Sequence, residues 1–209
     1  MNQRSSINIY NQDCMEAMKQ MSDNEFDLAI VDPPYGIKRD GHRGDPNFGW
    51  KKHTFKGWDN ARPKSKYFTE LFRVSKNQII WGANYFTSYI PPSKGWVYWD
   101  KGQKLTMSDG ELAFTSFDRA LRSITINRVE ILTDISIHPT QKPVKLYKWL
   151  LTNYAKEGDK ILDTHLGSGS IAIACWDLKF DLTGYEIDKE YYDNAIERIE
   201  RHKRQLNLF

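Results

Sequence analysis

Residues 32–36 read Asp-Pro-Pro-Tyr-Gly, which places a carboxylate and an aromatic ring close together in the chain. The apolar run before them, residues 26–31, predicts a buried strand. Proline has no N–H to donate to a sheet, and the residue before a proline stays extended, so the strand must end at Asp32. Ligands of open α/β sheets bind at the carboxyl ends of strands. We therefore expect a ligand site at this corner.

The acceptors at this corner suit a planar exocyclic amine, which carries two N–H donors. The Asp32 carboxylate and the Pro33 carbonyl can accept both protons, and the Tyr35 ring can stack on the flat face of a base. Accepting both protons would free the nitrogen lone pair for nucleophilic attack. The plainer alternative is a strand-ending turn with a hydrogen-bonded aspartate.

This corner resembles the (D/N/S)-P-P-(Y/F) signature of the amino-methyltransferases that act on adenine N6 or cytosine N4. The resemblance implies that Asp32, Pro33, Pro34 and Tyr35 are catalytic. It also implies direct transfer without a covalent cysteine intermediate, with the target base flipped out of the duplex onto Tyr35. Aspartate at the first position favours adenine, because serine is commoner there in the cytosine enzymes.

A glycine-rich loop stands near the other end of the chain. Residues 167–172 match G-x-G-x-x-(G/A), and Glu186 follows Gly167 by 19 residues, where a carboxylate can bind ribose hydroxyls. Taken alone, this loop fits either NAD or S-adenosylmethionine. Asp163 ahead of the loop favours a cationic methionine group over a pyrophosphate, and Lys142 could pair with the methionine carboxylate.

Three further segments extend the resemblance over most of the chain. Residues 163–170 are similar to D-P-F-x-G-S-G-T, residues 138–143 to H-P-T-x-K-P, and residues 184–191 to G-x-E-x-x-x-x-Y. The catalytic motif precedes the cofactor loop, as in the permuted β group of DNA amino-methyltransferases. Thr164 and His165 stand where the family has Pro and Phe, so we expect weaker cofactor binding.

The resemblance implies S-adenosylmethionine as the cofactor, with Asp13 at its adenine amine and Glu186 at its ribose. The full set of implied cofactor-binding residues is Asp13, Cys14, Asp32, Gln141, Lys142, Pro143, Asp163, His165, Gly167, Ser168, Gly169 and Glu186. The fold implied is Rossmann-like α/β, a mostly parallel seven-stranded sheet flanked by helices.

Periodicity and capping signals predict the elements that would position these residues. Strands are expected at 7–10, 26–31, 77–82, 95–100, 111–117, 160–163 and 181–186. Helices are expected at 15–21, 67–74, 84–89, 144–154, 171–178 and 190–205. The last third therefore reads as a βαβ unit.

The segment 37–66 lacks periodicity and is rich in basic and aromatic residues. Residues 38–66 carry nine Lys/Arg and three Asp, a net charge of +6, whereas the remaining chain is at −3. We expect a long mobile loop that closes over double-stranded DNA, although a solvated loop without a partner stays an alternative. The expected DNA contacts are Lys38, Arg39, Arg43, Trp50, Lys51, Lys52, Lys56 and Trp58. A small target-recognition segment is expected at 101–137.

The chain length predicts one domain over residues 1–209, because 209 residues and 24.5 kDa suit a single core, and the resemblance implies that it is a methyltransferase domain. The two cysteines lie far apart outside any C-x-x-C pattern, which indicates neither zinc nor a disulfide and favours a reducing cytoplasm. No stretch approaches the ~18 apolar residues of a membrane span, so we expect a soluble cytoplasmic protein. Whether it forms a homodimer stays open.

Three functions compete at this point. The first is a DNA adenine-N6 methyltransferase, with cytosine-N4 as its near variant. The second is an NAD-linked oxidoreductase, which would leave the Asp32 corner without a role, and the third is a catalytically silent DNA-binding module. The methyltransferase requires Asp32 and Gly167 to share one cavity.

Overall fold

The computed structural model describes residues 5–41, 53–102, 108–127 and 136–206. Within these ranges eight strands form one sheet, in the order β1-β8-β7-β2-β3-β5-β4-β6. Their bounds are β1 Ile7–Tyr10, β2 Phe26–Val31, β3 Ser75–Trp81, β4 Trp96–Asp100, β5 Gly110–Thr115, β6 Arg122–Thr125, β7 Lys160–Asp163 and β8 Asp181–Tyr185. The expected α/β fold is confirmed, and β6 is one strand more than the seven expected.

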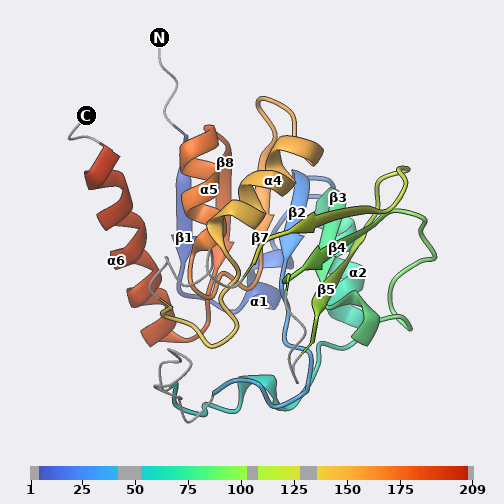
Figure 1. Ribbon diagram of the computed structural model, residues 1–209, viewed down its shortest axis with the longest axis horizontal. Coiled ribbons are helices and arrows are strands. Elements are labelled where there is room, and N and C mark those ends of the chain that lie inside the picture. The colour runs from blue at the N-terminus through green and yellow to red at the C-terminus, as the bar shows by residue number, and fades with distance from the viewer. Residues whose placement is uncertain (1–4, 42–52, 103–107, 128–135, 207–209) are drawn as a thin grey trace.

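Seven of these eight strands run in the same direction. β1, β8, β7, β2 and β3 pair in parallel, β5 is antiparallel to both of its neighbours, and β6 is parallel to β4. The carboxyl ends of the parallel strands therefore meet at one edge, drawn at the bottom of Figure 1, and the amino end of β5 joins them there.

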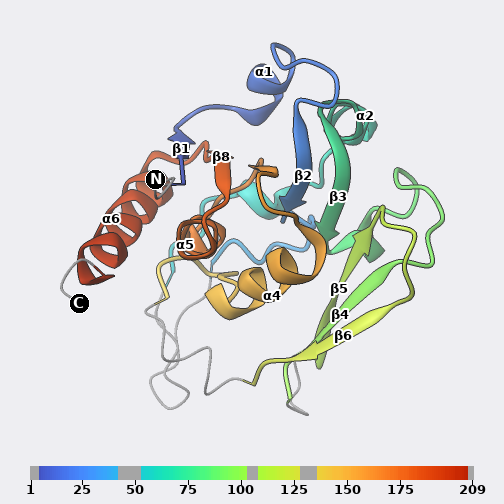
Figure 2. The ribbon, with the colours of Figure 1, turned by 90° about the horizontal axis from the view of Figure 1, so that it is seen from above.

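Helices cover both faces of the sheet. Viewed from above, α1 (Cys14–Met18) and α2 (Ser65–Val74) lie on one side, and α4 (Val144–Tyr154), α5 (Ser170–Leu178) and α6 (Lys189–Leu206) on the other (Figure 2). Within the described ranges, no helix combines the length and apolar composition needed to cross a membrane.

The central strand β2 shows why both faces are covered. Its side chains alternate: Leu28 and Ile30 pack in the core beneath α4 and α5, while Ala29 and Val31 pack in the core beneath α1 and α2. A strand buried on both faces reads as a continuous apolar run instead of an alternating one, as residues 28–31 do.

The described residues also contain two short 3-10 helices, η2 (Trp58–Asn60) and η3 (Ala83–Tyr85). Gly82 connects β3 to η3 with a φ of +64°, a conformation that glycine adopts without strain. A Cβ at this position would overlap the Tyr35 ring. Glycine therefore allows Tyr35 to lie against the end of β3.

The described parts of the basic segment are tied to each other by two buried aspartates. Asp59 accepts hydrogen bonds from the N–H groups of Gly36 (2.7 Å) and Arg39 (2.8 Å). Asp40 accepts from the N–H groups of Lys56, at 2.8 Å, and Gly57. The segment expected to be a mobile loop thus has ordered ends.

The segment 101–137, expected to be a recognition module, builds β5 and β6 of the main sheet where it is described. Residues 103–107 and 128–135 of that segment lie outside the described residues.

Candidate active site

Two adjoining cavities open at the carboxyl edge of the sheet. The larger, of about 360 Å³, includes Asp13 in its wall, and the smaller, of about 210 Å³, includes Asp32. We call them the Asp13 cavity and the Asp32 cavity. Both are lined by Pro34, His165, Glu186 and Ile187. They therefore meet at the glycine loop and can hold parts of one extended ligand.

Asp32 and Gly167 line the same cavity, as the sequence analysis required. Asp32 follows β2, and Gly167 lies in the loop after β7. β2 and β7 are parallel neighbours in the sheet, so their carboxyl ends lie side by side.

Both oxygens of Asp32 are engaged within the chain. Its Oδ1 accepts the Tyr35 hydroxyl at 2.6 Å, and its Oδ2 accepts the Lys142 ammonium at 2.5 Å. The Tyr35 ring stacks on Tyr85, with 5.1 Å between ring centroids and 16° between planes. Pro33 is buried behind the corner. The sequence analysis did not anticipate the stacking partner Tyr85.

Lys142 is buried, with only 3% of its side chain exposed, so a solvated role is excluded. Besides Asp32 it contacts Glu111, whose Oε2 lies 3.2 Å from Nζ, and the other Glu111 oxygen pairs with Lys101 at 2.7 Å. Sequence reasoning missed Glu111, because this residue lies in β5, outside the motifs around Asp32 and Gly167. It expected Lys142 to pair with a methionine carboxylate, and that role stays a prediction beside the ion pairs seen here.

Burial and charge shift the pKa values of these three groups in different directions. Burial raises the pKa of Asp32, Lys142 opposes that rise, and Glu111 adds to it. Burial tends to raise the pKa of Glu111, but Lys142 and Lys101 outweigh it and bring that pKa down to about 2. Burial tends to lower the pKa of Lys142, but Asp32 and Glu111 raise it on balance. Glu111 and Lys142 are therefore charged at neutral pH.

The glycine loop is held from two sides. Glu186 accepts the Gly167 N–H and the Asp188 N–H, each at 2.9 Å. The buried Arg198 of α6 donates to the Ser168 carbonyl at 2.7 Å and to the Ser170 hydroxyl at 3.0 Å. Burial raises the pKa of Glu186. Sequence reasoning also missed Arg198, because α6 carries many charged residues and the sequence does not show which of them are buried.

The two residues that depart from the family loop form a hydrogen-bonded chain. The Thr164 hydroxyl lies 2.9 Å from His165 Nδ1 and 2.7 Å from the Tyr67 hydroxyl. Burial lowers the pKa of His165 to about 4, so the imidazole is neutral at pH 7. A neutral ring in the wall of both cavities can pack against a ligand.

Asp163 lies deeper than expected. It is 1% exposed, accepts the His165 N–H at 2.9 Å, and is not among the residues that line either cavity. Burial raises its pKa to about 8. Asp163 therefore contributes no surface to either cavity, and its expected effect on a methionine group stays a prediction.

The Asp13 cavity combines a carboxylate with a thiol. Asp13 caps α1 by accepting the Met15 N–H at 2.7 Å, and it also lines the cavity, so a capping role and a binding role are compatible. Burial raises the pKa of the Cys14 thiol to about 12, so this thiol stays protonated and unreactive.

Nine of the twelve expected cofactor residues line at least one cavity: Asp13, Cys14, Asp32, Gln141, Lys142, His165, Gly167, Ser168 and Glu186. The other three do not. Pro143 is the N-cap of α4, Gly169 is the N-cap of α5, and Asp163 is buried.

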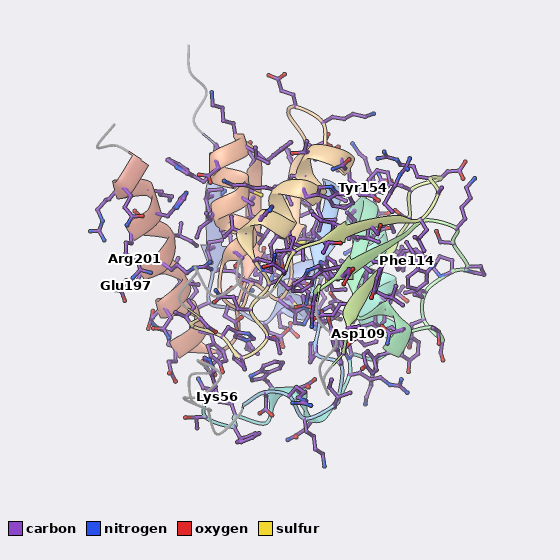
Figure 3. All side chains as sticks on the ribbon, viewed as in Figure 1. Lys56, Asp109, Phe114, Tyr154, Glu197 and Arg201 are labelled. Carbon is purple, nitrogen blue, oxygen red and sulfur yellow. The ribbon has the colours of Figure 1, made fainter. Side chains whose placement is uncertain are left out.

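The expected DNA contacts separate into four groups. Lys38 and Arg39 are exposed. Lys56, labelled in Figure 3 beside the foot of α6, pairs with Asp188 at 2.7 Å and Glu190 at 2.8 Å. Trp58 stacks on His138, with 5.2 Å between centroids, and lines the Asp32 cavity. The remaining residues lie outside the described residues: Arg43, Trp50, Lys51 and Lys52.

Comparison with solved structures identifies the same fold. A structure of M1.HpyAVI in complex with SAM superposes with a TM-score of 0.63 at 20% identity, covering 92% of this chain and 99% of that one. The cytosine-N4-specific PvuII DNA methyltransferase superposes with a TM-score of 0.59 at 14% identity, covering 98% and 94% of the two chains.

Sequence comparison identifies the family. The Type II methyltransferase M.HpaI of Haemophilus parainfluenzae is 26% identical over 233 residues, covering 89% of this chain and 72% of the relative. The family model described as DNA methylase, of the N6/N4 class, matches residues 82–197, more than half of the chain. With the Asp32 corner and the glycine loop in one cavity, the chain belongs to the N6/N4 DNA methylase family.

Proposed function

We propose that this chain transfers a methyl group from S-adenosylmethionine to the N6 amine of adenine in double-stranded DNA. The observation that carries the proposal is the shared cavity, whose wall contains both Asp32 and Gly167. An NAD-linked oxidoreductase would leave the Asp32 corner without a role, and it finds no support in the family match.

The two adjoining cavities fit S-adenosylmethionine, the methyl donor of this family. Asp13 would accept the adenine amine in the larger cavity, and Glu186, at the junction, would accept the ribose hydroxyls. Gly167 and Ser168 would border the methionine group, next to Lys142. When bound, the cofactor supplies an electrophilic methyl group on a sulfonium.

Catalysis by the chain is positioning and charge stabilisation. Asp32 accepts a hydrogen bond from the target amine and receives the proton as positive charge develops on nitrogen. The Tyr35 hydroxyl, now 2.6 Å from Asp32 Oδ1, must yield that oxygen to the amine. The Tyr35 ring is proposed to stack on the flipped base.

The choice of adenine rests on the aspartate at position 32. In the family, serine is commoner at this place in the cytosine-N4 enzymes. The fold does not separate the two, because a cytosine-N4-specific enzyme superposes over most of the chain.

The DNA path is proposed to pass Lys38 and Arg39, which are exposed. The chain is proposed to form one domain, with target recognition in the segment 101–137. The described part of this segment contributes β5 and β6 to the main sheet.

The decisive experiment incubates the protein with unmethylated duplex DNA and S-adenosylmethionine labelled in its methyl group, followed by digestion to nucleosides. Label in N6-methyladenine supports the proposal. Label in N4-methylcytosine would show instead that cytosine is the target base. DNA binding without label would contradict methyl transfer.

Substitution of Asp32 tests the role of the corner. We expect Asp32→Ala to lower kcat by at least about 10³-fold, because both the acceptor and the proton carrier are lost. Calorimetry with S-adenosylhomocysteine should show an affinity within about tenfold of wild type, since Glu186 and Asp13 remain. Undiminished turnover would rule out Asp32 as the catalytic acceptor.

A further inference from the structure

Glu111 reaches the active site because its strand runs against the others. β5 is antiparallel to β3 and β4, so its first residues lie at the edge where the parallel strands end. Figure 3 shows this direction, with Asp109, just before β5, nearer that edge than Phe114. The N–H of Gly82 donates to the Leu112 carbonyl at 2.9 Å, which fixes the backbone beside Glu111.

The Glu111 carboxylate completes a row of four charges of alternating sign. Asp32 contacts Lys142 at 2.5 Å, Lys142 contacts Glu111 at 3.2 Å, and Glu111 contacts Lys101 at 2.7 Å. Lys142 also donates to the Tyr35 hydroxyl at 3.3 Å. These side chains are mostly buried, so the interactions are strong and the removal of one partner leaves another charge uncompensated.

The row has a consequence for Asp32. If Lys142 paired with Asp32 alone, its positive charge would stabilise the Asp32 carboxylate. Asp32 would then be less basic and a poorer acceptor for the proton of an amine. A second carboxylate on the same ammonium divides that attraction and makes Asp32 more basic.

We propose that Glu111 is a positioning residue for methyl transfer, which shares the Lys142 ammonium with Asp32 and thereby keeps Asp32 available to the target amine. The inference rests on the proposed function for the reaction it serves. Glu111 acts through Lys142 and Asp32, without contact to the reacting atoms.

Several other groups influence Asp32 and must be considered in any pH experiment. Tyr35 contacts it directly, and Tyr67 of α2, Tyr147 of α4 and Asp163 of β7 interact with it electrostatically. Burial raises the pKa of each tyrosine above its ordinary value of 10.0, so none of the three ionises near neutral pH. Asp163, whose pKa is about 8, does titrate there, and a comparison of variants at fixed pH cancels its contribution.

The test compares Glu111→Gln with wild type and with Asp118→Asn, a matched acid-to-amide change. Asp118 pairs with Lys94 on the surface and is 90% exposed. We expect Glu111→Gln to lower kcat by at least about tenfold, with the KM for DNA and the affinity for S-adenosylhomocysteine within about twofold of wild type. The acid limb of the kcat profile should move to lower pH, because loss of the Glu111 charge lowers the pKa of Asp32. Asp118→Asn should match wild type.

Glu111→Asp keeps the charge and should retain the wild-type acid limb. A displaced acid limb in Glu111→Asp would contradict a role of the charge, so the inference stays testable if Glu111→Gln does not fold. An unchanged kcat and acid limb in Glu111→Gln would overturn the inference. So would a loss of cofactor affinity that accounts for the whole fall in turnover.

A second readout needs no catalysis. NMR of protein labelled at the lysine side chains should show the Lys142 signal, identified by its absence in Lys142→Met, titrating at lower pH in Glu111→Gln than in wild type. An identical titration in the two proteins would show that Glu111 does not affect the pKa of Lys142, and it would overturn the inference. If wild type fails to methylate DNA, the proposed function falls, while the Lys142 titration still decides the Glu111 contact.

Discussion

At the scale of single residues, Asp163 makes stability depend on pH. Its pKa is raised by burial from 3.8 to about 8, so the folded protein binds this proton more tightly than the unfolded chain. The neutral carboxyl stabilises the fold fully below the unfolded pKa, and that contribution is lost as pH rises through the folded pKa.

We therefore expect Asp163→Asn, which stays neutral, to gain stability over wild type as pH rises from about 4 to about 8, by an amount on the order of a few kcal/mol. Urea unfolding at several pH values in this range measures the gap. Asp118→Asn provides the exposed control and should show little change. A gap that does not vary with pH would contradict a buried protonated Asp163.

Gly82 allows the position of Tyr35, and its replacement tests that packing. We expect Gly82→Ala to destabilise the fold by about 2 to 4 kcal/mol, because a left-handed backbone is strained with a Cβ and the new methyl group overlaps the Tyr35 ring. Turnover should fall as Tyr35 is displaced.

Gly158→Ala is the matched control, because Gly158 has a φ of +87° but open space where its Cβ would lie. It should show the backbone cost alone, about 1 kcal/mol. Equal losses of unfolding free energy in the two variants would show that the Tyr35 contact does not matter.

Individual site residues were predictable where a motif fixes them and not where tertiary packing does. Asp32 and Gly167 follow from local chemistry, because prolines end one strand and glycines open one loop. Glu111 could not be found this way, since only the reversed direction of β5 brings it to the site. Asp163 was placed correctly along the chain, but its depth depends on how the loop folds over it.

At the scale of elements, the basic segment contains charges of two kinds. Lys38 and Arg39 are exposed, whereas Lys56 is already paired with Asp188 and Glu190. Counterion release gives each phosphate contact a slope of about −0.9 in the logarithmic dependence of affinity on salt.

We expect Lys38→Met and Arg39→Met each to reduce that slope by up to about 0.9, and Lys56→Met to leave it nearly unchanged. Fluorescence anisotropy of labelled duplex DNA over a series of salt concentrations measures the slopes. An equal reduction in all three variants would show that Lys56 leaves its acidic partners to bind DNA.

Most elements were predictable because each has an unambiguous period. The apolar alternation of β1 and the amphipathic stripe of α4 gave bounds that match the structure. β6 was missed because it has four residues, mostly exposed, at the sheet edge, where burial imposes no pattern.

At the scale of the whole molecule, residues from both ends of the chain build one site. The order of the motifs, through resemblance to the permuted enzymes, predicted that the Asp32 corner and the glycine loop meet. Hydrophobic periodicity alone could not, because it does not specify which strands become neighbours. The strand order settles the matter, with β7 placed directly beside β2.

The register between β2 and β7 determines how the two halves of the site are positioned relative to each other. Leu28 lies opposite Ile161 and Ala29 opposite Leu162. A slip of one residue would shift the two halves by about 3.3 Å and turn every side chain of β2 to the opposite core. An error of even 1 Å between reacting atoms can slow chemistry about 100-fold. The register of two buried strands in the middle of the sheet thus determines the distance between the methyl donor and its acceptor.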